Sequence, residues 1–215
     1  MANSSSENNL APIHVTPSRK VIIFVLTPIL RLLAKIQINN TENIPIEGAA
    51  ILASNHLSFF DGFVLQYAVK RPVFFMGKAE VFRNPFLRLF MFKIGAFPVE
   101  RGSFDRGAIS HARKVLQAGQ LLGMFPEEHR TYGYGMIAAK SGTAHLAMKL
   151  NCPIIPVAMD GTHYIFKHPF KRANVTVKFL TPIYPEQKIT AQNLTDALMR
   201  EIASQLPNRL RGYYG

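Results

Sequence analysis

The chain alternates short apolar runs with helix-length segments, and this alternation limits the folds open to it. The apolar runs at residues 49–54, 121–125 and 153–158 are too short for ordinary helices and suit strands buried on both faces. Helix-like apolar spacing marks the segments 61–69, 104–118, 140–150 and 191–205. Strands that alternate with helices predict an α/β fold with a largely parallel central sheet flanked by helices.

The N-terminal part of the chain differs from the rest, so three regions are expected. Residues 1–18 are small and polar and predict a mobile tail, residues 19–40 an amphipathic helical segment, and residues 41–215 a single α/β domain. The apolar stretch in the second region is broken by Pro28 and is shorter than the about 20 residues that span a bilayer. Two interpretations stay open for it: a helix that lies on a membrane surface, or an ordinary helix packed on the domain.

The net charge of the chain limits the kinds of molecule that it is expected to bind. The chain has 25 Lys and Arg against 13 Asp and Glu, a formal charge of +12, which favours nucleic acid, an acidic lipid surface or a phosphorylated substrate. The one cysteine, Cys152, excludes an internal disulfide. No set of His, Cys and Asp residues has ligand spacing, so we expect no metal.

The first cluster of reactive side chains follows the apolar run 49–54. His56 and Asp61 are five residues apart across a predicted strand-to-helix turn, so the carboxylate can fold back onto the imidazole. A carboxylate on one ring nitrogen leaves the other nitrogen free to act as a base. A surface histidine beside a helix-capping aspartate is the alternative.

Two more clusters carry polar side chains at predicted strand ends. Residues 95–102 place Glu100 and Arg101 between glycines, and residues 125–131 contain Glu127 and Arg130. An arginine side chain presents a planar fork that suits phosphate. Lys140 is close enough in sequence to residues 125–131 that it can face the same site.

Together, these blocks resemble the glycerolipid acyltransferase superfamily, and the lysophosphatidate acyltransferases most of all. The resemblance rests on His-x4-Asp at 56–61, the Gly…Arg block at 95–101, Phe-Pro-Glu…Arg at 125–131 and the proline-bracketed apolar strand at 153–156. Four blocks in register cover about residues 45–165, more than half of the chain.

The resemblance implies a membrane-associated enzyme that moves a fatty acyl group from a thioester to the hydroxyl of a lysophospholipid. His56 would be the general base and Asp61 its orienting partner; Arg101, Glu127, Arg130 and Lys140 would bind substrate. Acyl-CoA or acyl carrier protein would be the donor, lysophosphatidate the acceptor, and no cofactor would be needed.

One departure leaves the acceptor open. Glu128, His129 and Thr131 stand where the family usually has Gly, Thr and Ser, and Glu128 adds a negative charge beside the phosphate site that the resemblance implies. Another lysolipid or an amine-lipid acceptor is therefore a second candidate.

Basic and aromatic residues interleave at 70–93 and again at 166–172, which predicts contact with an anionic membrane surface on its cytoplasmic face, peripheral or monotopic. The rivals are a basic nucleic-acid-binding module and a catalytically dead membrane scaffold. Nucleic acid is not expected, because the basic residues are spread along the chain and a binder would not need the four blocks.

Overall fold

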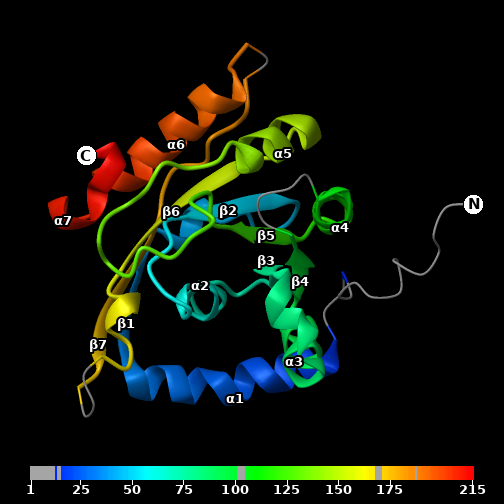
Figure 1. The fold of residues 1–215 in the computed structure, drawn as a ribbon, viewed down its shortest axis with the longest axis vertical. Coiled ribbons are helices and arrows are strands. Elements are labelled where there is room, and N and C mark those ends of the chain that lie inside the picture. The colour runs from blue at the N-terminus through cyan, green and yellow to red at the C-terminus, as the bar shows by residue number, and fades with distance from the viewer. Residues whose placement is uncertain (1–12, 14–15, 101–104, 168–170, 187) are drawn as a thin grey trace, which may run out of the picture.

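A seven-stranded sheet forms the centre of the computed structural model, in the order β1-β7-β6-β2-β5-β3-β4 (Figure 1). The structure describes residues 13, 16–100, 105–167, 171–186 and 188–215. The strands are β1 (Ala34–Asn39), β2 (Ala50–Ser54), β3 (Val73–Lys78), β4 (Ala96–Val99), β5 (Leu121–Met124), β6 (Ile154–Asp160) and β7 (Ala173–Phe179).

Five neighbouring strands run parallel, and the sheet changes direction at one side. β6, β2, β5, β3 and β4 pair in parallel, β7 pairs antiparallel with β6, and β1 runs parallel to β7. The predicted α/β fold with a largely parallel sheet is confirmed. The parallel strands therefore end at one common edge.

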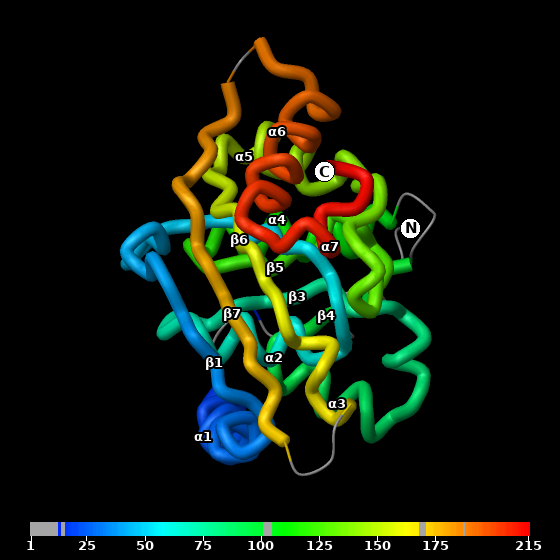
Figure 2. The backbone as a smooth tube through the Cα atoms, turned by 90° about the vertical axis from the view of Figure 1, so that its left-hand side faces the viewer, coloured from blue at the N-terminus to red at the C-terminus, as the bar shows by residue number. Residues whose placement is uncertain are grey.

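Helices cover both faces of the sheet (Figures 1 and 2). α4, α5 and α6 pack on one face, and α1 and α2 lie over the other, with α3 beside them. The helices are α1 (Pro17–Leu33), α2 (Asp61–Ala68), α3 (Pro85–Lys93), α4 (Arg106–Gln117), α5 (Gly142–Leu150), α6 (Ala191–Ser204) and α7 (Asn208–Arg211). Short 3₁₀ turns lie at Thr41–Asn43, Ala79–Arg83, Thr162–Tyr164 and Gly212–Tyr214.

Local sequence sets several helix starts. The Asn84 side chain accepts the N–H groups of Phe86 and Leu87, and Pro85 occupies the first helical position, where its missing N–H leaves no hydrogen bond unmade. Thr16 caps α1 ahead of Pro17 in the same manner.

The N-terminal helix is shorter than the helical segment expected over 19–40. The helix ends at Leu33, and the next six residues form β1, because Ile36 and Ile38 alternate with polar residues and pair with β7. Most of the tail expected over 1–18 lies outside the described residues, and its last two residues belong to the first turn of α1.

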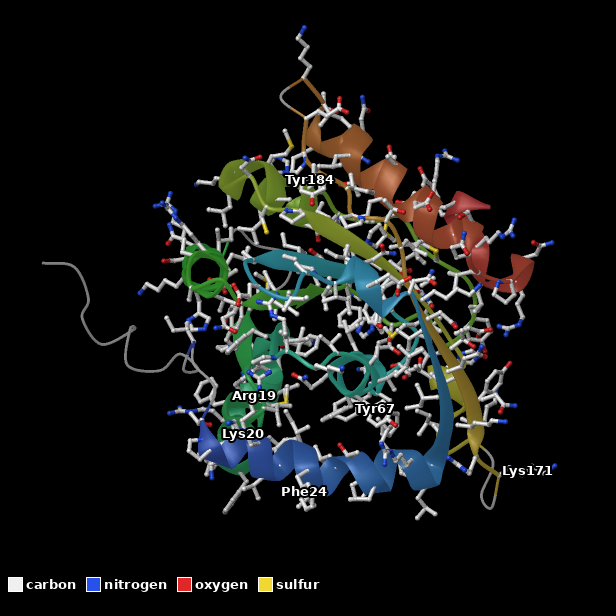
Figure 3. All side chains as sticks on the ribbon, turned by 180° about the vertical axis from the view of Figure 1, so that it is seen from behind. Arg19, Lys20, Phe24, Tyr67, Lys171 and Tyr184 are labelled. Atoms are coloured by element: carbon white, nitrogen blue, oxygen red, sulfur yellow. The ribbon has the colours of Figure 1, made fainter. Side chains whose placement is uncertain are left out.

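The helix α1 is buried on one side and exposes apolar residues on the other. Leu30 is buried against the sheet side, and the Arg19 guanidinium is buried over the ring of Phe74. On the outer side Phe24 is 81% exposed and points away from the body of the protein (Figure 3), with Val21, Val25 and Leu32 also exposed. None of the described helices is long and apolar enough to cross a bilayer.

Candidate active site

The carboxyl edge of the parallel strands holds a buried histidine–aspartate pair. Nδ1 of His56, just after β2, lies 2.7 Å from Oδ2 of Asp61, the first residue of α2. His56 is 8% exposed and Asp61 is fully buried. Because a carboxylate accepts hydrogen bonds, Nδ1 carries the hydrogen, and Nε2 is left as the accepting nitrogen of the neutral ring.

Four further donors hold the Asp61 carboxylate. Oδ2 also accepts the backbone N–H groups of Leu57 at 2.6 Å and Ser58 at 2.8 Å. Oδ1 accepts the hydroxyls of Thr162 at 2.5 Å and Ser58 at 3.3 Å. A buried carboxylate with this many donors is stabilised as the anion and fixed in orientation.

The plane of the imidazole is fixed by aromatic packing. The His56 ring stacks on Phe125 with centroids 4.2 Å apart and an interplanar angle of 17°. Phe125 in turn stacks on Phe75, with centroids 6.4 Å apart. Gly123 leaves room for that ring, because a Cβ there would overlap the Phe75 side chain.

Glu127 holds the backbone of the histidine turn. Its Oε1 accepts the His56 N–H and its Oε2 accepts the Ile137 N–H, both at 2.8 Å, and the residue is 2% exposed. Burial raises the pKa of Glu127 to about 7, against the two backbone hydrogen bonds, which lower it. Both oxygens thus accept main-chain N–H groups, and the contacts of this buried side chain are with the backbone of the histidine turn.

The segment after Glu127 wraps the same turn. The Thr131 N–H and hydroxyl both donate to the His56 carbonyl, and the Tyr132 N–H donates to the Leu57 carbonyl. Glu128 has φ +59°, a left-handed conformation that glycine adopts readily and other residues seldom do. Glu128 therefore adopts a backbone conformation that suits the glycine found at this position in the motif that the chain resembles.

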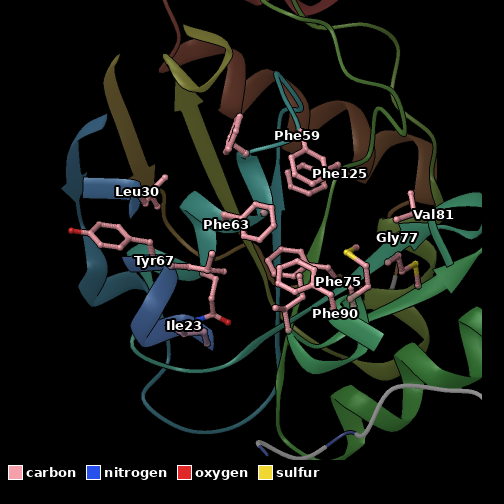
Figure 4. Close-up of a pocket in the computed structure, with 18 of the residues that line it drawn as sticks. Ile23, Leu30, Phe59, Phe63, Tyr67, Phe75, Gly77, Val81, Phe90 and Phe125 are labelled. Atoms are coloured by element: carbon pink, nitrogen blue, oxygen red, sulfur yellow. The ribbon is translucent and has the colours of Figure 1, made fainter. Parts of the chain in front are cut away.

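An apolar cavity of about 440 Å³ runs from the pair to the inner side of α1 (Figure 4). Rings of α2, β3 and α3 line it, among them Phe63, Phe75 and Phe90. Ile23 and Leu30 of α1 close the far side. His56 and Phe125 also line the cavity. Because Asp61 holds Nδ1, Nε2 is the ring nitrogen left to meet a substrate there.

Two cations also line this cavity. Arg130 follows β5, with its guanidinium carbon 5.6 Å from the Tyr132 ring centroid. Lys78 ends β3 and forms an ion pair with Glu80 at 3.1 Å. Cations that line the same cavity as a histidine can hold an anionic group near it.

The predicted site residues are only partly brought together. His56, Asp61, Glu127 and Arg130 gather at the carboxyl edge. Lys140 is exposed and donates its backbone N–H to the Pro126 carbonyl, and it does not line the cavity. Arg101 lies outside the described residues.

Sequence reasoning missed three residues of the site: Lys78, Thr162 and Asn55. The Asn55 side chain bonds both backbone polar groups of Met159, which ties the end of β2 to β6. Lys78 is the last residue of β3, one of the parallel strands that end at this edge. In the described part of the chain, no three His, Cys, Asp or Glu side chains are grouped to hold a metal ion.

The sequence of this chain is similar to those of bacterial acyltransferases. The 1-acyl-sn-glycerol-3-phosphate acyltransferase of Bacillus subtilis is 28% identical over 193 residues, which cover 86% of this chain and 94% of the relative. The enzyme of the same name from Borreliella burgdorferi is 27% identical over 179 residues, 80% of this chain and 72% of the relative.

The fold also matches a solved structure. The crystal structure of the 1-acyl-sn-glycerophosphate (LPA) acyltransferase of Thermotoga maritima superposes with a TM-score of 0.68 at 20% identity, over 86% of this chain and 78% of that one. The family model described as acyltransferase matches residues 35–160, more than half of the chain and the part that carries the His56–Asp61 pair. The chain therefore belongs to the acyltransferase family.

Proposed function

We propose that this protein transfers a fatty acyl group from a thioester to the free hydroxyl of lysophosphatidate and so forms phosphatidate. The observation that carries the proposal is the buried His56–Asp61 pair, whose histidine lines an apolar cavity and has Nε2 left over from the pair. The names of the two bacterial relatives support the choice of acceptor.

In the proposed reaction, Nε2 of His56 takes the proton of the acceptor hydroxyl while its oxygen attacks the thioester carbonyl. The Asp61 carboxylate stabilises the imidazolium that forms. Collapse of the tetrahedral intermediate breaks the carbon–sulfur bond, and the imidazolium returns the proton to the leaving thiolate. General base catalysis of this kind contributes about 10²–10⁴ in rate.

No acyl-enzyme is needed in this scheme. Cys152 is buried, and burial raises the pKa of its thiol to about 11. It directly precedes the proline before β6, at the edge of the sheet opposite His56. Because the thiolate is the reactive form, this cysteine is a poor nucleophile. We also propose that the thioester substrate is the only small molecule required beside the acceptor.

The cavity and its two cations suggest where the substrates bind. An apolar channel lined by phenylalanine rings suits an acyl chain, because burial of each methylene is worth about 0.8 kcal/mol. Arg130 and Lys78 would hold the acceptor phosphate. Glu127 would act through the backbone of the histidine turn rather than on the substrate.

We also propose that the protein works on the cytoplasmic face of an anionic membrane. The exposed apolar side of α1 and the exposed Phe86, Leu87 and Leu89 of α3 support this proposal. Lys20 and Arg31 flank the apolar stretch of α1, and such residues add about 1 kcal/mol each near an acidic leaflet.

The test is acyl transfer by purified protein. Labelled acyl-CoA and acyl carrier protein would be offered with lysophosphatidate, other lysophospholipids and an amine lipid, and the products identified by mass spectrometry. We expect phosphatidate as the main product, and turnover close to background in His56→Ala. Preference for a zwitterionic or amine acceptor would overturn the acceptor assignment and point to Glu128. Folded protein that acylates nothing would refute the function.

A further inference from the structure

Thr162 contacts the active site although it is distant from His56 and Asp61 in the sequence. It opens the 3₁₀ turn after β6, is fully buried, and lies 101 residues from Asp61, whose Oδ1 accepts its hydroxyl. Gly161, just before it, has φ +89°, and a Cβ there would collide with the Asn174 carbonyl. The backbone conformation at residue 161 therefore requires glycine, and this conformation places the Thr162 hydroxyl against the carboxylate.

A second contact ties the same strand end to the same turn. Asn55, next to His56, bonds the N–H and the carbonyl of Met159, both at 2.9 Å, near the end of β6. Side chains on both sides thus connect the end of β6 and the turn after it with the histidine turn. Such paired connections are typical of a supporting shell built around reactive groups.

The donors are unevenly shared between the two oxygens of Asp61. Oδ2 has three, from His56, Leu57 and Ser58, all within 2.8 Å. Oδ1 has only the Thr162 hydroxyl at 2.5 Å and the more distant Ser58 hydroxyl at 3.3 Å. Without Thr162, one oxygen of a fully buried carboxylate would keep a single long hydrogen bond.

We infer that Thr162 is a positioning residue for the acyl transfer proposed above: its hydroxyl holds Oδ1 of Asp61 so that Oδ2 stays directed at Nδ1 of His56. Thr162 does not touch the reacting atoms. It acts through Asp61, whose orientation decides how well the imidazole is held during proton transfer. The inference rests on the proposed function.

Other ionisable groups face the pair, and any pH measurement must account for them. Glu127 lies behind the His56 backbone, and Arg130 and Lys78 line the adjoining cavity. His163, next to Thr162, has its pKa lowered mainly by burial. All of them are retained when only the Thr162 hydroxyl is removed, so a change can be assigned to that group.

The experiment removes the hydroxyl without changing the side-chain shape. Thr162→Val is compared with Thr162→Ser, which keeps the hydroxyl, and with Thr195→Val, which removes a buried, hydrogen-bonded hydroxyl from α6. For each variant, kcat, KM and the pH profile of kcat/KM are measured, together with the pH titration of the His56 ring followed by NMR.

For Thr162→Val we expect kcat to fall about ten-fold or more, with KM for both substrates within about two-fold. A carboxylate that is no longer held toward Nδ1 stabilises the imidazolium less, so the acid limb of kcat/KM and the titration of the His56 ring move to lower pH. Thr162→Ser restores both properties, and Thr195→Val changes only thermal stability.

Unchanged kcat in a folded Thr162→Val variant would overturn the inference. So would a fall in kcat with the acid limb and the ring titration unmoved, since that pattern marks a purely structural role. Failure of the wild-type protein to transfer acyl groups refutes the proposed function instead. The NMR titration needs no turnover, so it tests the contact of Thr162 with the pair in either case.

Discussion

Replacing Asp61 by asparagine would remove the charge of the pair and keep its shape. The asparagine carbonyl can occupy the place of Oδ2 and accept from His56, Leu57 and Ser58. Its amide nitrogen then faces the hydroxyls of Thr162 and Ser58, which can turn to accept. We therefore expect Asp61→Asn to fold with a melting temperature close to that of the wild type.

The structure sets the size of the catalytic loss. At 2.7 Å and an effective dielectric constant of about 20, opposite unit charges attract by about 6 kcal/mol. The asparagine carbonyl keeps a neutral hydrogen bond worth about 1 kcal/mol. Since the charge acts only on the imidazolium of the transition state, kcat should fall by between about 10² and 10⁴, with KM little changed.

The assay is steady-state acyl transfer with the single variants Asp61→Asn and His56→Ala and with the double variant. Once the imidazole is gone the carboxylate has no proton to stabilise, so Asp61→Asn should change the residual rate of His56→Ala by less than about two-fold. A folded Asp61→Asn variant within ten-fold of wild type would refute the reasoning, and so would fully additive losses.

Two further predictions concern the buried glutamate and the outer side of α1. Burial raises the pKa of Glu127 from 4.5 to about 7. The protonated side chain therefore makes its full contribution to stability below about pH 4.5, and this contribution is lost as the pH rises through 7. The unfolding free energy of wild type relative to Glu127→Gln should therefore fall across this range in urea titrations; a constant difference would contradict it. Phe24→Glu should weaken binding to anionic liposomes at least several-fold, with melting temperature unchanged, whereas Thr195→Val should bind normally. Undiminished liposome binding would exclude the outer side of α1 as the membrane contact.

Features that depend on neighbours along the chain could be predicted from the residues alone. The alternation of strands and helices follows from local apolar spacing, and the Asn84–Pro85 helix start follows from one side chain and the next peptide unit. The His56–Asp61 contact belongs to the same class, because five residues across a turn fix how far apart the two groups can be. The resemblance to acyltransferases was likewise carried by short blocks of residues.

Contacts between segments that are distant in the sequence became visible only in the tertiary structure. Glu127 looks like a substrate ligand in the sequence, and only the fold buries it on a backbone N–H 71 residues away. Thr162 gives no signal before β6 brings it to Asp61. β1 was taken for helix because its partner β7 follows more than a hundred residues later. The pattern of neighbouring residues determines local backbone conformation. Strand order, register and burial arise instead from packing between segments that are far apart in the sequence, so the local pattern does not reveal them.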